Sequence, residues 1–437
     1  MISTSNIFLK ISIFIAFFFS SINGASIYNI SLNKICLLPL YIYLFFSFIL
    51  NKNKFQKCNI SVFFIITYYI LGIISSLYSL TSTSVNVIGF VNKTILYTIQ
   101  NFFIWIPIIV LLSLSIKKEF IFEYAKESLI FVCRINVIVC FFEFLSFIIS
   151  GPLVTEFLLS IFFDSTISIP YIYIPGVGCF LRPSGLNLVP SYFGLILCLG
   201  FLFERTKNWK LLIFLASVLS MSRTSLTVIT FVIIINYCLS STFYNYKCIS
   251  LKSARFLVIA FICFVFVLML IIFNEHIYNQ INALISRYKF SNEIKSDDLG
   301  TLRHLLYITK SLEVYIFYLD FFQQIFGFGP RASGVILTSS AVMAEQLKEP
   351  IFYTMWTVEC DFSELLLGHG LLGFILYFVL FWYISKVDHQ GKIFAIGFFI
   401  FSLLYEASTT TLLQLVIIIY LVCSRHKHLK TTRNKNA

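Results

Sequence analysis

The chain has 437 residues, of which 59% are hydrophobic and only 12% are charged, and its mean hydropathy is +0.90. Soluble domains are nearer half apolar and a quarter charged, so this composition excludes a soluble protein and predicts a polytopic membrane protein. The formal net charge of +12 does not indicate a nucleic-acid partner, because the basic residues are distributed as a membrane protein distributes them.

Apolar runs near the length that crosses a bilayer, about 20 residues, recur along the chain. We interpret the first as a membrane helix and not as a cleaved signal peptide, because no charge precedes Lys10. The twelve predicted transmembrane helices lie at residues 7–23, 35–50, 60–80, 96–115, 128–150, 190–203, 209–222, 225–240, 255–273, 362–385, 392–407 and 410–424.

The expected fold is therefore an all-α polytopic membrane protein with about twelve transmembrane helices and one large external loop between spans nine and ten. The segments are spans one to nine in residues 1–273, the loop in 274–361, spans ten to twelve in 362–424, and a basic tail in 425–437.

The basic residues predict the orientation. Nineteen Lys and Arg residues lie in alternate connections and the tail, whereas the short connections on the other face carry only Lys34, Lys93, Arg182 and Arg223. Since cytoplasmic connections are rich in Lys and Arg, both termini are expected in the cytoplasm. The 274–361 loop then faces outward, which means the periplasm if the cell is Gram-negative and the protein lies in its inner membrane.

Within the large loop, residues 313–328 are too short and too polar to span the membrane. Their aromatic side chains are typical of a helix that lies in the membrane interface. Gly327 and Gly329, followed by Pro330, should end that helix.

Three arginines far apart in sequence, Arg182, Arg223 and Arg303, are predicted on the same external face. The planar guanidinium of Arg presents a fork of donors that matches phosphate oxygens. The alternative is contact with anionic lipid headgroups, and we favour that alternative for Arg287 and Arg331.

An acidic cluster, Glu359, Asp361 and Glu364, precedes the tenth span. A carboxylate partly removed from water at a membrane boundary could act as a general base. An ordinary acidic first turn of a helix explains the same pattern equally well.

The fifth span carries two ionisable groups, Arg134 and Glu143, which lie too far apart along a helix to pair. Arg134 can extend to the inner face, so Glu143 remains the functional candidate. His369 is expected to pack or cap. The sequence has no metal-ligand constellation, phosphate loop or dinucleotide fingerprint, so we expect no metal and no cofactor.

Three signatures occur in order: Arg182-Pro-Ser-Gly185 before a span, Ser220-Met-Ser-Arg223-Thr-Ser225, and Arg303 followed by Gly327-Phe-Gly-Pro330, Glu359-Cys-Asp361 and Gly370-Leu-Leu-Gly373. Together with the predicted topology, this order resembles the O-antigen polymerase (Wzy-type) family, to which the O-antigen ligases (WaaL-type) are related. The resemblance covers roughly residues 180–385.

The resemblance implies a glycosyltransferase of lipopolysaccharide biosynthesis that works at the periplasmic face. Such an enzyme moves a growing glycan from undecaprenyl diphosphate onto a new lipid-linked oligosaccharide repeat unit. Arg182, Arg223 and Arg303 would bind the diphosphate and stabilise the leaving group. Asp361, then Glu359, then Glu364 would be the base, and the partners would be the lipid-linked units, membrane lipids and a chain-length regulator.

Two alternatives stay open. Ligases typically carry a His-Asn pair near the position of Glu359, and this chain lacks that pair, which favours a polymerase. A flippase should have similar halves, charges near the midplane and short external loops, and the chain has one loop of nearly 90 residues.

Overall fold

The computed structural model describes residues 4–22, 26–27, 30–50, 60–79, 94–115, 117–150, 157, 171–174, 178–187, 190–220, 222–239, 311–339, 360–405, 408 and 410–424. The predicted ninth span, most of the large loop and the basic tail lie outside these residues.

The first half of the chain is a series of apolar helices with one small hairpin. In chain order these elements are α1 (Thr4–Ser20), β1 (Ser26–Ile27), β2 (Ile30–Ser31), α2 (Leu32–Ile35), α3 (Leu38–Leu50), α4 (Ile60–Ser79), α6 (Leu96–Leu114) and α7 (Lys118–Ser150).

The remaining elements begin with a second hairpin, and several short helices precede the last long ones. The elements are β3 (Tyr171–Ile174), β4 (Gly178–Leu181), α9 (Pro190–Phe203), α10 (Lys207–Leu219), α11 (Arg223–Leu239), α15 (Phe321–Phe326), α16 (Ser333–Ser339), α18 (Asp361–Ser363), the π-helical turn η5 (Glu364–Gly368), α19 (His369–Ser385), α20 (His389–Leu404) and α21 (Thr411–Cys423).

Helices dominate the described residues, as the sequence predicts, and the two antiparallel hairpins β1–β2 and β3–β4 were not predicted. Four helices are long and apolar enough to cross a membrane: Ile60–Ser79, Leu96–Leu114, Lys118–Phe147 and Asp361–Ser385. Every predicted span within the described residues falls on a helix. These features fit a multi-pass membrane protein.

One boundary differs clearly from the prediction, because α7 begins at Lys118 and not near residue 128. The added turns carry Glu119, Glu123, Lys126 and Glu127, which are good helix formers. The carboxylate of Glu119 also lies in the first turn, near the positive end of the helix dipole. The charged connection between two spans is therefore the first part of the helix itself.

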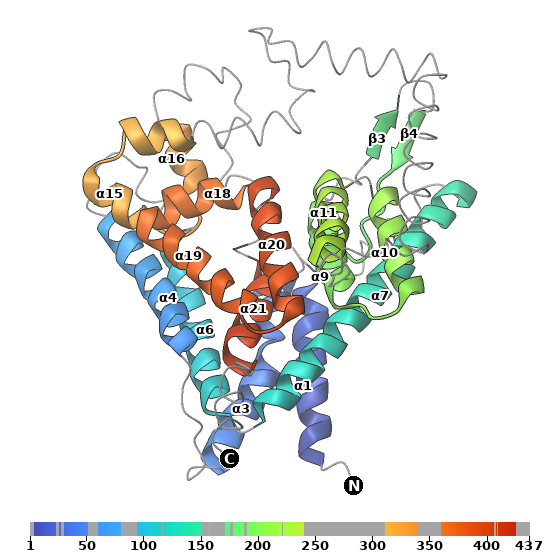
Figure 1. Ribbon diagram of the computed structural model, residues 1–437, viewed down its shortest axis with the longest axis horizontal. Coiled ribbons are helices and arrows are strands. Elements are labelled where there is room, and N and C mark those ends of the chain that lie inside the picture. Colours follow the sequence, from blue (N-terminus) through green and yellow to red (C-terminus); the bar gives the residue numbers. More distant parts are fainter. Residues whose placement is uncertain are drawn as a thin grey trace, which may run out of the picture.

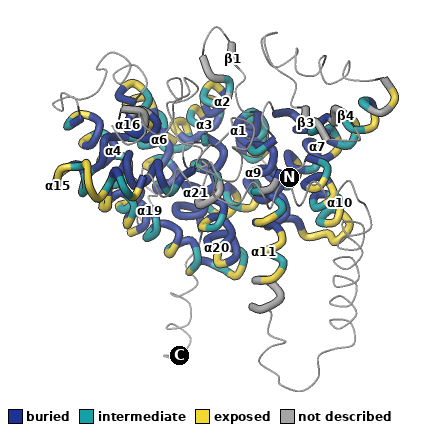
Figure 2. The backbone as a smooth tube through the Cα atoms, turned by 90° about the horizontal axis from the view of Figure 1, so that it is seen from above, coloured by how far each residue is buried: buried dark blue, intermediate teal, exposed yellow. Residues whose placement is uncertain are grey.

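The core is formed around α9 and α21, which are apolar on all sides and buried along almost their whole lengths. A helix without a polar face must be surrounded by other helices. The α21 helix packs against α4, α6, α7 and α19, and α9 packs against α7, α10, α11 and α20. Both appear dark blue within the bundle in Figure 2.

The described basic connections meet at one end of the bundle. Lys10 of α1 pairs with Glu127 at 2.9 Å, and Lys117 Nζ donates to Asn6 Oδ1 at 2.8 Å. Lys126 of α7 lies 3.7 Å from Asp388, which caps α20. Figure 1 shows the start of α1 at this end, whereas α15, α16, α18 and the β3–β4 hairpin lie at the opposite end. The alternation of charge in the sequence thus corresponds to two ends of the bundle.

Candidate functional site

The six predicted site residues fall in different parts of the structure. Arg182, Asp361 and Glu364 are described, and Arg223 is the first residue of α11. Arg303 and Glu359 lie outside the described residues. We therefore build the site from two groups of contacts, one around Arg182 and one around the acidic turn.

The loop that carries Arg182 is bound to α7 by a buried carboxylate. Glu143 Oε2 accepts hydrogen bonds from the backbone N–H groups of Ser184 at 3.1 Å and Gly185 at 2.9 Å. Glu143 is fully buried, and its Oε1 has no hydrogen-bond partner among the described residues. A buried carboxylate that binds backbone N–H groups holds the loop against the helix. Glu143, a functional candidate from the sequence, therefore has a clear positioning role.

A second buried side chain of α7 fixes the next residues of the same loop. Asn136 Oδ1 accepts from Leu186 N at 3.1 Å and from Asn187 Nδ2 at 3.2 Å. Gly185 has φ +62°, and a Cβ atom there would press against Asn136 and Phe193. The Ser-Gly step of the motif is thus needed for a tight left-handed turn on the surface of α7.

Arg182 links this loop to the second arginine motif. Its Nε donates to the backbone oxygen of Ser220 at 3.2 Å. Ser220 is the C-cap residue of α10, and Arg223 starts α11 three residues later. Two of the three signatures that define the resemblance therefore meet at one place, between α7, α10 and α11.

Arg134 pairs with an acidic residue of the connection between α9 and α10, which the basic residues predict to be cytoplasmic. Its Nε and Nη2 donate to Glu204 Oε2 and Oε1 at 2.8 and 2.9 Å, and its guanidinium lies 4.9 Å from the Trp209 ring centroid. Glu204 is the residue directly after α9. The sequence could not predict it as the partner of Arg134, because the spacing of Arg134 and Glu143 concerns one helix alone. This bidentate pair joins α7 to the α9–α10 connection.

The acidic turn belongs to a second group, built around the Gly327-Phe328-Gly329-Pro330 turn. Helix α15 ends at Phe326, and Gly327 caps it with φ +71°, as the glycines predict. Phe328 N then donates to Leu367 O at 3.0 Å and Gly329 N to Gly368 O at 2.6 Å. These carbonyls are free to accept because Gly370, with φ +63°, breaks the helical hydrogen-bond pattern.

Helix α4 holds the other side of the same turn. Ser79 Oγ donates to Phe328 O at 2.9 Å, and Ser75 Oγ donates to Phe326 O. A Cβ on Gly327 would collide with the backbone of Gly368 and Gly370. Sequence reasoning missed these serines, although three serines on one face of an apolar helix were a visible signal.

Both described acids are fully buried and bound by the protein. Asp361 accepts from Ser408 N at 2.8 Å and from Ser408 Oγ at 2.6 Å. Glu364 accepts from the backbone N–H of Arg331 and from the hydroxyl of Ser333. Such contacts are typical of carboxylates that hold backbone turns in place, and Ser408 was not predicted from the sequence.

Cys360, just before the acidic turn, is a buried thiol that donates to Ser402 O at 3.8 Å. Burial raises its pKa to about 11, although hydrogen bonds with the backbone at Ser363 and Phe362 act in the opposite direction. The thiol is therefore protonated at neutral pH and is a poor nucleophile.

The two groups lie on different sides of α20, which packs against both α11 and α18 (Figure 1). The structure thus brings Arg182 close to the Arg223 turn, and Asp361 close to Glu364. It does not gather these residues into a single cluster.

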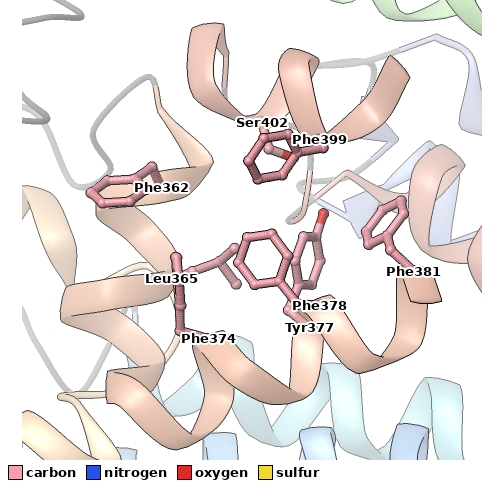
Figure 3. A pocket seen from close by; sticks show the side chains of 8 residues that line it. All are labelled: Phe362, Leu365, Phe374, Tyr377, Phe378, Phe381, Phe399 and Ser402. Carbon is pink, nitrogen blue, oxygen red and sulfur yellow. The ribbon is translucent and has the colours of Figure 1, made fainter. Parts of the chain in front are cut away.

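An apolar hollow adjoins the acidic turn (Figure 3). Rings from α18, α19 and α20 surround it, and the lining consists of Phe362, Leu365, Phe374, Tyr377, Phe378, Phe381, Phe399 and Ser402. A surface of this kind suits a hydrocarbon chain better than a sugar.

Among the described residues, no group of three or more His, Cys, Asp or Glu side chains could hold a metal ion. No model of a known protein family matches the chain, and a search of curated proteins also found no match.

Proposed function

We propose that the protein is a membrane glycosyltransferase of the O-antigen polymerase type in the bacterial inner membrane. It transfers a growing glycan from undecaprenyl diphosphate onto a new lipid-linked repeat unit at the periplasmic face. The observation that supports this most is the Arg182 loop, which Glu143 holds beside the turn leading to Arg223. A fixed arginine next to a second arginine turn provides donors suited to a diphosphate.

In this proposal the arginines act on the leaving group. The bond between the anomeric carbon and the diphosphate oxygen breaks, and the diphosphate departs with the electron pair. Arg182, Arg223 and Arg303 stabilise that charge. Each preorganised donor of this kind lowers a reaction barrier by about 3 kcal/mol. The aromatic hollow of Figure 3 offers an apolar surface for the isoprenoid chain.

The acceptor hydroxyl forms the new glycosidic bond and must lose a proton. Asp361 is the first candidate for this base because Ser408, which donates to it at 2.6 Å, also lines a polar hollow. A hydroxyl bound in that hollow could pass its proton through Ser408 to Asp361. Glu359 remains the second candidate and Glu364 the third, although its two protein donors favour a structural role.

The ligase alternative uses the same donor and differs in its acceptor, the lipid A core. The absence of the His-Asn pair near Glu359 keeps it second. A flippase should have charges near the membrane midplane that can act on its substrate. Arg134 offers no such charge, because it forms a bidentate pair with Glu204.

The test is complementation of cells that lack the protein with Arg182→Ala or Arg223→Ala. We expect polymer to disappear and a single attached repeat unit to remain, while immunoblots show normal insertion. Arg205→Ala is the matched control, since Arg205 pairs at the opposite end of the bundle with exposed Glu123. A near-normal chain length in both variants would refute the role of the arginines.

A further inference from the structure

Two cations stand at the end of the bundle whose short connections carry few basic residues. Lys34 Nζ of α2 donates to Gln100 Oε1 at 2.9 Å and lies 5.3 Å from the ring centroid of Tyr97. The guanidinium carbon of Arg331 lies 4.6 Å from the same ring. Two positive charges therefore share one aromatic ring at the first turn of α6.

This arrangement has an electrostatic cost. Burial lowers the pKa of Lys34, and the positive charge of Arg331 lowers it further. Like charges held close together disfavour the charged form, so an anion bound beside them is stabilised. Glu364 binds the backbone N–H of Arg331, and Ser333 shares that carboxylate. Two cations on the face predicted to be external also run against the usual distribution of Lys and Arg in membrane proteins.

A polar hollow opens beside these two cations. Tyr97 and Pro330, the neighbour of Arg331 in sequence, both line it, and its remaining lining comes from α4, α6, α19 and the segment before α21. The polar groups of that lining include Thr98, Asn101, His369, Ser408 and Gln414.

His369 provides an unsatisfied polar atom in this hollow. The residue is 4% exposed, and its Nδ1 has no hydrogen-bond partner among the described residues. Its ring is fixed by stacking on Tyr68, with centroids 4.8 Å apart and planes inclined by 12°. A buried polar atom without a partner among the described residues needs an explanation, and a bound ligand is one such explanation.

We propose that Lys34, Arg331 and this hollow form a binding site for a phosphate-bearing anion, either a lipid headgroup or free phosphate. Lys34 and Arg331 hold the phosphate oxygens, and Tyr97 orders the two cations. Exposed apolar side chains lie close in sequence to Lys34 and Tyr97, namely Leu38 at the start of α3 and Leu96 and Ile99 in α6. They offer a surface for acyl chains. The site is separate from the Arg182 loop, but it adjoins the hollow in which the proposed function places the acceptor hydroxyl beside Ser408. The binding measured below does not require polymer formation, so the two proposals can fail separately.

The experiment is native mass spectrometry of the purified full-length protein in detergent. Phosphatidic acid and phosphatidylcholine are titrated in parallel, and inorganic phosphate is added as a competitor. Lys34→Gln and Arg331→Gln should each weaken the binding of phosphatidic acid about tenfold, since each removes one charge-assisted contact. Arg331→Lys keeps the charge and should retain most of the binding.

Lys10→Gln is the matched control, because Lys10 also lies over a tyrosine ring, at 5.4 Å from Tyr124, but at the opposite end. Saturable binding of phosphatidic acid that inorganic phosphate does not displace identifies a lipid headgroup. Displacement by inorganic phosphate identifies free phosphate, and either result supports the site. Equal binding by wild type, Lys34→Gln and Arg331→Gln overturns it, as does an equal loss in Lys10→Gln. Gel filtration shows that each variant is folded.

Discussion

Glu143 is the residue on which the geometry of the Arg182 loop most depends. Its carboxylate is fully buried in α7, and two backbone N–H groups of the loop donate to it. Removing the carboxylate leaves both donors buried without a partner, which costs free energy of unfolding. The same change releases the turn from which Arg182 reaches Ser220.

We predict that Glu143→Ala destabilises the protein by about 1–3 kcal/mol and abolishes polymer formation. Thermal unfolding in detergent, followed by fluorescence, measures the first effect, and a polysaccharide gel measures the second. Glu127→Ala is the control, because Glu127 forms an exposed pair with Lys10 and should contribute less than about 1 kcal/mol. Unchanged stability in Glu143→Ala would contradict the anchoring role.

Glu204 gives a pH-dependent prediction. Burial alone would raise its pKa, but hydrogen bonds from Arg134 and Thr206 outweigh burial and lower the pKa from 4.5 to about 2. A carboxyl group whose pKa falls on folding stabilises the protein at pH values above its pKa in the unfolded state. This stability is lost as the pH falls towards its pKa in the folded state.

Between pH 4.5 and pH 2, the wild type should therefore lose more thermal stability than Glu204→Gln. At neutral pH the variant should be the less stable of the two, since Arg134 loses its charged partner. Parallel slopes of unfolding temperature against pH would show that the pair contributes no such linkage.

At the scale of elements, the turn at 327–330 joins α15 to the kink before α19. The glycines of that turn and of the Gly368-His369-Gly370 segment approach each other too closely for any side chain. The glycines of the turn predicted a helix stop, and α15 ends there. The partner of the turn could not be predicted, because pairing across the fold leaves no local pattern.

Gly370→Ala should lower the free energy of unfolding by more than about 1 kcal/mol, because alanine disfavours φ +63° and its Cβ would collide with the backbone of Ile325. Gly397→Ala is a matched control within α20, where the nearest atom is 3.1 Å away on the side chain of Val232. Comparable unfolding temperatures for the two variants would contradict the close packing at Gly370.

The sequence predicted the helices well, because each span is a long apolar run, and it placed the described basic connections at one end. It missed contacts that join distant segments, such as Arg134 with Glu204 and Asp361 with Ser408. It also missed the two hairpins, whose strands are only two and four residues long. Periodicity and composition report local structure, whereas these features depend on which helices become neighbours.

At the scale of the whole molecule, the described basic connections lie at one end of the bundle, and this arrangement predicts that this end faces the cytoplasm. In intact cells, a cysteine introduced at Asn292, which lies outside the described residues, should react with a membrane-impermeant maleimide. A cysteine at Lys207 should react only after permeabilisation, with the exposed native cysteines replaced by serine in both cases. Protection at position 292 together with labelling at 207 would reverse the orientation.

We propose that the protein lengthens a lipid-linked glycan before its attachment. The most direct measurement is a gel of surface polysaccharide from cells that lack the protein. We predict that the ladder collapses to lipid A core bearing a single repeat unit, because ligation still proceeds. An unchanged ladder would contradict the account. So would complete loss of attached glycan with polymer accumulating on its lipid carrier, since that result identifies a ligase.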